Sequence, residues 1–156
     1  MGEEQIGNPA GAFAPLSGIN VPPGVPEISY KVLYNSGATA IKQGGWVALD
    51  VAGTAGHING IKAGAHGGVL HDVVGIAMES IAVGAYGKVC VEGPATALGS
   101  TAGITTGDQV TGSTASTDDQ CVMTASTPLV GQVIGIALET AAAVVDTAVL
   151  VWVRSA

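Results

Sequence analysis

The chain has 156 residues, a formal net charge of −7 and an aromatic content of only 4%. This length fits a single domain with its own core, and the scarcity of aromatic residues means that the core must be built from small side chains packed closely. The five basic residues are scattered along the chain, which argues against nucleic-acid binding because neutralising phosphates requires clustered Lys or Arg.

Neither a secretory signal nor a membrane span is expected. The first thirty residues contain five prolines and no Lys or Arg, which does not fit a signal peptide. The most apolar stretch, residues 128–153, is interrupted by Gln132, Glu139 and Asp146, so it lacks the roughly 20 consecutive apolar residues of a spanning helix. The sequence therefore predicts a soluble protein with no membrane partner.

Residues 1–29 are predicted to form an extended N-terminal arm. This segment holds five of the seven prolines, and its apolar residues follow neither a helical nor a strand period, so it cannot pack by itself. A disordered tail is one interpretation, but an arm that docks on another protein subunit is favoured because a solvated tail would carry more charge. The candidate docking residues are Ile6, Phe13, Leu16, Ile19, Val21 and Val25.

A β domain is predicted for residues 30–156. Its first strand is expected at residues 27–34, where Ile28, Tyr30, Val32 and Tyr34 fall on one face. A second strand is expected at residues 46–51, with Val47, Leu49 and Val51 facing the core. Further strands are predicted at residues 57–61, 69–78 and 88–92, and the Ser-, Thr- and Gly-rich residues 99–127 should form short strands and long loops.

Two parts of this domain repeat each other. Residues 73–80 have the sequence VVGIAMES and residues 133–140 have VIGIALET, and a V-x-V run follows each at residues 89–91 and 149–151. The separation is 60 positions throughout, with no gap. An I-x-x-G-x-x-V leader precedes each copy, which gives repeats of approximately 38–93 and 101–153. The sequence therefore predicts two related β-meander units in a small β-barrel or β-sandwich.

A helix at residues 137–148 is the competing interpretation on propensity alone. The first copy has Gly84 and Gly87 in the matching region, where a helix would be costly, and their counterparts at the same spacing are Val144 and Thr147. Because two copies of one unit should share a conformation, strands are favoured here.

One face of the last strand is a candidate interface. Val149, Val151 and Val153 form its core face, so Leu150 and Trp152 lie on the opposite one. Trp46 occupies the corresponding side of the earlier strand at residues 46–51. Because a core of small side chains buries little area per residue, we expect assembly with other subunits, and these three residues are the candidate contacts.

No catalytic, cofactor or metal site is predicted. His57, His66 and His71 with Asp72 match no zinc-binding spacing, and solvated loop histidines are the favoured interpretation. Residues 82–89 come nearest to a phosphate-binding loop but lack its first Gly and its final Ser or Thr, which favours a hairpin turn. No G-x-S-x-G elbow occurs. We therefore expect a protein that is not an enzyme.

The repeated Glu79 and Glu139 could be paired carboxylates, but a turn in which each accepts backbone N–H bonds is the favoured interpretation. Cys90 and Cys121 are too few for a disulfide framework. A bridge between them stays open, and Cys90 is most simply a small apolar residue.

The doubled pattern of residues 41–91 and 104–151 resembles the capsid cement or head decoration proteins of tailed bacteriophages. The resemblance implies a small β-barrel or β-sandwich protein on the outer surface of the virion, made in the host cytoplasm. It implies that the protein clamps neighbouring major capsid subunits of an expanded head, usually as a homo-oligomer, with a trimer favoured over a dimer. A self-associating component of a fibre, tail or surface layer is the alternative, and a carbohydrate-binding module or an enzyme comes third.

Overall fold

All regular structure in the described residues is β-strand. The computed structural model describes residues 27–50, 60–63, 73–113, 120–125 and 133–154. Its strands are β1 (Ser29–Asn35), β2 (Trp46–Leu49), β3 (Gly60–Ala63), β4 (Val73–Ala77), β5 (Tyr86–Gly99), β6 (Gln109–Gly112), β7 (Val122–Thr124), β8 (Gly135–Ala137) and β9 (Thr147–Val153). The predicted all-β fold is confirmed. In these ranges no helix has the length and apolar character that crossing a membrane requires.

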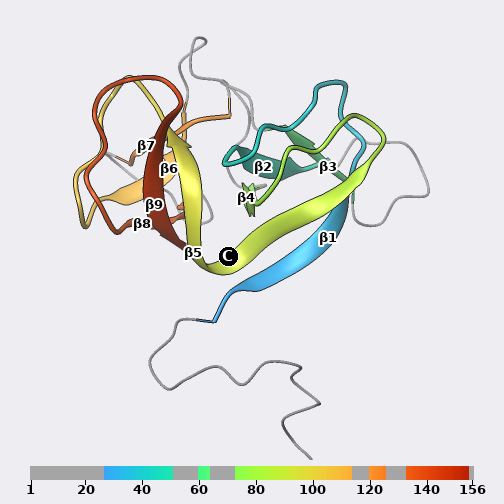
Figure 1. Ribbon diagram of the computed structural model, residues 1–156, viewed down its shortest axis with the longest axis horizontal. Coiled ribbons are helices and arrows are strands. Elements are labelled where there is room, and N and C mark those ends of the chain that lie inside the picture. The colour runs from blue at the N-terminus through green and yellow to red at the C-terminus, as the bar shows by residue number, and fades with distance from the viewer. Residues whose placement is uncertain (1–26, 51–59, 64–72, 114–119, 126–132, 155–156) are drawn as a thin grey trace, which may run out of the picture.

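The strands form two small barrels that share β5 (Figure 1). In the first barrel, β1, β3, β2, β4 and β5 are hydrogen-bonded in that order, and β1 pairs again with β5 to close the ring. In the second barrel, β5, β7, β6, β8 and β9 follow the same plan, and β9 pairs again with β5. Closure of each ring pairs the strand edges that an open sheet would expose.

β5 is 14 residues long and serves both barrels. Its first half pairs with β1 and β4, and its second half pairs with β9 and, at Gly99, with β7. Gly93 lies between the halves with a φ of +106°, and a Cβ there would meet the carbonyl oxygen of Glu27, so glycine is required. β5 bends between the barrels (Figure 1). The prediction that this strand ends at Glu92 is wrong, because the bend does not interrupt the pairing.

The barrels repeat each other strand by strand. Leu33 lies opposite Gly87 in the β1–β5 pair, and Ala97 lies opposite Val149 in the β5–β9 pair. In each barrel the first strand runs parallel to the third, so the units are not the simple meanders that the sequence predicted. Each structural unit also includes a strand before the predicted repeat, giving residues 29–92 and 93–153.

The repeat contains one insertion that the gap-free alignment missed. Ala77 pairs with Val89 in the first barrel, and Ala137 pairs with Val151 in the second. The closing strands therefore correspond at a separation of 62 positions rather than 60, because residues 78–88 separate the first pair and residues 138–150, two residues more, separate the second. Because the insertion contains an even number of residues, each side chain stays on the same face of its strand. The predicted buried valine face of β9 is therefore confirmed.

The insertion also changes the counterpart of a turn glycine. Gly84 has a φ of +75°, and the residue with a matching φ of +60° is Asp146 rather than Val144. Aspartate is one of the few side chains that enters the left-handed region readily. The turn is therefore kept with a different residue.

Matching apolar positions fill both interiors. The buried residues of the first barrel are Leu33, Ile41, Val47, Ile61, Ala77, Ile81 and Val89, and those of the second are Ala97, Ile104, Val110, Val122, Ala137, Ala141 and Val151. A core made of Ala, Val and Ile agrees with the low aromatic content.

One pair of interior positions exchanges size between the barrels. A Cβ added to Gly87 would collide with the Ile81 side chain. In the second barrel the smaller Ala141 stands where Ile81 stands in the first, and the larger Val149, rather than Thr147, replaces Gly87. The combined volume is thus kept nearly constant, as close packing requires.

β2 departs from the predicted alternation. Val47 is fully buried as expected, but Leu49 is 41% exposed. A register shift between Val47 and Ala48 in the pairing with β4 interrupts the alternation, and Leu49 is the last residue of the strand. The third residue of the predicted core face, Val51, lies outside the described residues.

The remaining predicted elements overlap observed strands wherever the structure describes them. β4 lies within the predicted strand at residues 69–78, of which residues 69–72 lie outside the described residues. β3 overlaps the end of the predicted strand at residues 57–61, of which residues 57–59 also lie outside them. β6 and β7 are short, as expected for residues 99–127. The helix alternative at residues 137–148 is wrong, because β8 and the start of β9 occupy that range with a turn between them.

Candidate binding surface

One part of the outer face of the first barrel, on β2, β4 and β5, is buried against the second barrel. Trp46, Ile76 and Cys90 are neighbours across β2, β4 and β5, they point away from the first interior, and none is more than 1% exposed. They join the apolar core of the second barrel. The Trp46 ring lies over Gly112, where a Cβ would collide with it. Trp46 was predicted to lie at an interface with another subunit, but the structure places it inside the chain.

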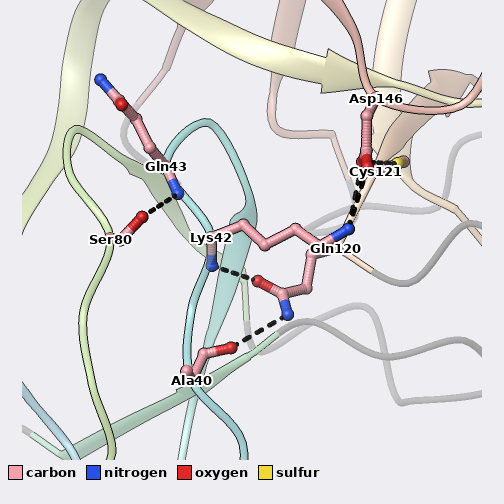
Figure 2. Close-up of polar contacts among 7 residues, drawn as sticks. All are labelled: Ala40, Lys42, Gln43, Ser80, Gln120, Cys121 and Asp146. Atoms are coloured by element: carbon pink, nitrogen blue, oxygen red, sulfur yellow. Dashed lines mark hydrogen bonds and ion pairs between the residues drawn. The ribbon is translucent and has the colours of Figure 1, made fainter.

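Polar contacts reinforce this junction between the barrels (Figure 2). The Gln120 side chain accepts the Lys42 backbone N–H at 2.7 Å and donates to the Ala40 carbonyl at 3.1 Å. The Lys42 ammonium lies 3.1 Å from the Asp146 carboxylate, and the Cys121 thiol donates to the same carboxylate at 3.5 Å. Gln120 is 5% exposed, so its hydrogen bonds are worth more than the half-exposed ion pair.

The turn before β2 packs on the outside of β5. The Leu98 backbone N–H donates to the Gly44 carbonyl at 2.9 Å, and a Cβ on Gly44 would lie 3.2 Å from the Leu98 side chain. A cleft of about 430 Å³ opens beside this contact, lined by Gln43, Gly44, Ala77 and Met78 from the first barrel and Pro94, Ala95, Thr96 and Leu98 from β5. The Gln43 backbone N–H donates to the Ser80 hydroxyl at 3.3 Å (Figure 2) and holds the turn.

Large apolar side chains are exposed on the outer face of β1, on the residue just before it and at the start of β5; this surface is called here the β1 face. Ile28, Tyr30, Val32 and Tyr86 are 44%, 53%, 52% and 64% exposed. The Tyr86 ring packs against Tyr34 with centroids 5.1 Å apart. The predicted sharing of one face by alternate residues of this strand is therefore confirmed, and the face points outward.

No pattern in the sequence indicates that the β1 face points outward, because both faces of β1 carry apolar residues. Leu33 points into the barrel and is 6% exposed. The Lys88 ammonium stands 5.4 Å from the centre of the Tyr30 ring, so a cation–π contact covers part of the β1 face.

The second barrel exposes apolar residues at its far side. Leu150 and Trp152, the other predicted interface residues, are half-buried, and Ile136 lies beside Trp152 across the β8–β9 pair. Leu138, which follows β8, is 41% exposed. The predicted docking residues of the arm all lie in residues 1–26, outside the described residues.

The two repeated carboxylates have a structural role. Glu79 accepts the Lys88 backbone N–H at 2.8 Å, and Glu139 accepts the Leu150 backbone N–H at 2.7 Å. Each carboxylate thereby caps the first hydrogen bonds of a hairpin. The interpretation of these residues as backbone acceptors is confirmed, although the bonded N–H belongs to the closing strand rather than to the turn.

The cysteines are both buried as free thiols. Burial raises the pKa of the Cys90 thiol, and a hydrogen bond to the Glu92 backbone opposes this. Within the described ranges, no three His, Cys, Asp or Glu residues are placed to hold a metal ion. His57, His66, His71 and Asp72 lie outside these ranges.

Of the comparisons with known proteins, only the one with solved structures found a likeness. No family model matches the chain, and no curated protein matches it. Among solved structures, the chain is similar to the N base of the head fiber protein gp8.5 of bacteriophage phi29, with a TM-score of 0.54 and 17% sequence identity. The match covers 81% of this chain and 97% of the phi29 chain. At this identity the likeness shows a shared fold.

Proposed function

We propose that the chain is a structural protein of a phage virion that binds the outside of the head and cements neighbouring major capsid subunits. The observation that carries this proposal is the shared fold with the base of a phage head fiber, which extends over 97% of that chain. The resemblance of the repeated sequence pattern to head decoration proteins supports the same class independently.

The proposed role is adhesive rather than enzymatic. Glu79 and Glu139, the repeated carboxylates, are engaged with backbone N–H groups, whereas Tyr30, Val32 and Leu138 offer exposed apolar surface. Apolar surface of this kind supports contacts with other protein chains. Each contact would be weak, but many copies bound to one capsid lattice would together stabilise the shell. A homo-oligomer fits such a lattice, and a trimer is favoured over a dimer.

Binding to heads tests the proposal directly. The full chain is mixed with expanded heads of the parent phage that lack decoration, and bound protein is measured by co-sedimentation against unexpanded heads as the control. We expect saturable binding at a fixed ratio of chain to major capsid protein, and decorated heads should resist a higher temperature before releasing DNA. Absence of binding to expanded heads at micromolar concentration would reject the cement role.

A component of a fibre, tail or surface layer is the second candidate, and the head-fiber identity of the structural neighbour favours it. This candidate predicts long polymers of the chain without heads, whereas the cement role predicts a small oligomer. Negative-stain electron microscopy of the purified chain separates the two.

A further inference from the structure

The junction joins a surface of the first barrel to a surface of the second. Within the described residues, each of these two surfaces has an exposed counterpart on the other barrel. At the junction, the forward surface of the first barrel, made of Gly44, Trp46, Ile76 and Met78, packs on the back of the second barrel. Because the barrels repeat each other, the second barrel has its own forward surface, made of Gly107, Gln109, Ile136 and Leu138. Among the described residues, no further barrel covers this surface.

The forward surface of the first barrel is buried at the junction, whereas the forward surface of the second barrel is exposed. A Cβ on Gly44 would touch Leu98, whereas no described atom lies within 4 Å of a Cβ on the matching Gly107. Trp46 is 1% exposed, but its counterpart Gln109 is exposed. Met78 is half-buried, and its counterpart Leu138 is 41% exposed.

The β1 face is the matching back surface of the first barrel. On the second barrel, the back surface is the outer side of β5 at Pro94 and Thr96, which lines the junction cleft. The register of β1 and β5 makes Tyr30 the counterpart of Pro94 and Val32 the counterpart of Thr96. Pro94 is half-buried at the junction, whereas Tyr30 is 53% exposed and carries a far larger apolar surface than proline.

We propose that copies of this chain associate head to tail, with the forward surface of one second barrel packed on the β1 face of the next chain. The contact repeats the geometry of the internal junction. It also gives a partner to exposed Leu49, which is the counterpart of Gly112. Inside the chain, the large Trp46 packs against Gly112. Between chains, the smaller Gln109 would pack against Leu49, which is larger than glycine. The combined side-chain volume of the two pairs is therefore similar.

A second copy is the occupant that fits both free surfaces at once. The forward surface and the β1 face are different surfaces, and the internal junction shows that surfaces at these positions pack together. Contacts between unlike surfaces close into a ring or continue as a filament. The inference deepens the self-association in the proposed function, and it is tested without heads, so its failure and the failure of head binding are separate results.

Two variants, each lacking one half of the contact, provide the test. Leu138→Glu places a charge on the forward surface, and Val32→Glu places one on the β1 face; Val144→Glu is the matched control, because Val144 is 58% exposed and lies on neither surface. Each protein is examined by sedimentation velocity, with circular dichroism to confirm folding. We expect the wild type and Val144→Glu to form the same oligomer and each half-variant alone to be monomeric.

Mixing the two half-variants gives the decisive result. Leu138→Glu keeps a good β1 face and Val32→Glu keeps a good forward surface, so an equimolar mixture should form a 1:1 dimer that grows no further. A half-variant that still assembles alone would overturn head-to-tail packing in favour of contacts between like surfaces. A mixture that stays monomeric while the wild type assembles would also overturn it. A monomeric wild type at 100 μM would overturn the inference outright and would leave the arm or a capsid subunit as the occupant of the β1 face.

Discussion

Ile81 and Gly87 show that close packing is set one residue at a time in this core. The second barrel solves the same packing problem with Ala141 and Val149. The sequence repeat could not reveal this exchange, because the two-residue insertion places the wrong residues opposite one another. Only the strand register identifies the pairs.

A double-mutant cycle tests this exchange. Ile81→Ala should destabilise the fold by about 2–5 kcal/mol because it leaves a cavity, and Gly87→Val should cost about 1–3 kcal/mol because the new side chain collides with Ile81. The double variant copies the second barrel and should lie within about 1.5 kcal/mol of the wild type. Urea unfolding measures all four proteins, and additive losses would contradict the proposed equivalence.

Cys90 should make stability sensitive to alkali. Burial raises the pKa of its thiol, so the folded chain holds this proton more tightly than the unfolded chain. Stability from this group is therefore complete below the ordinary pKa of 9.0 and falls as pH rises above it, by at most about 1.4 kcal/mol per pH unit. Urea unfolding between pH 8 and 11 should show a shallower decline for Cys90→Ala than for the wild type, and equal slopes would exclude this contribution.

At the scale of strands, the sequence predicted what depends on local pattern. Alternation located β1, β2 and the buried valines of β9, and the repeat predicted strands rather than a helix at residues 137–148. Pairing partners could not be predicted, because the parallel contact of β1 with β3 and the sharing of β5 depend on residues far apart in the chain. The prediction for Trp46 fails for the same reason. The alternation places its side chain on the outer side of β2, but it does not show that the second barrel of the same chain covers that side.

The Gln120 side chain joins the second barrel to the first through hydrogen bonds to the Lys42 and Ala40 backbone. Gln120→Ala removes two hydrogen bonds across the junction and leaves the Lys42 N–H without its acceptor, which should cost about 2 kcal/mol. Lys42→Ala removes only a half-exposed ion pair and should cost less than about 1 kcal/mol. Chemical denaturation of both variants provides the comparison, and an equal loss would show that Gln120 does not hold the junction.

At the scale of the whole molecule, the described strands form two joined barrels, and the predicted arm precedes them. Because β1 begins at Ser29, deletion of residues 1–26 should leave the β circular-dichroism spectrum and the unfolding midpoint unchanged. Assembly should weaken because the predicted docking residues are removed. Sedimentation and head binding of the truncated chain measure this effect, and loss of the β signal would show that these residues belong to the fold.

The central claim is that repeated barrels continue their internal junction from chain to chain on the outside of a phage head. An electron-microscopy reconstruction of expanded heads incubated with the full chain tests it most directly. We predict added density on the outer surface in which barrels follow one another with the spacing of the internal junction, the second barrel of one chain lying against β1 of the next. Bare heads, or isolated chains with no contact between barrels of neighbouring copies, would contradict it.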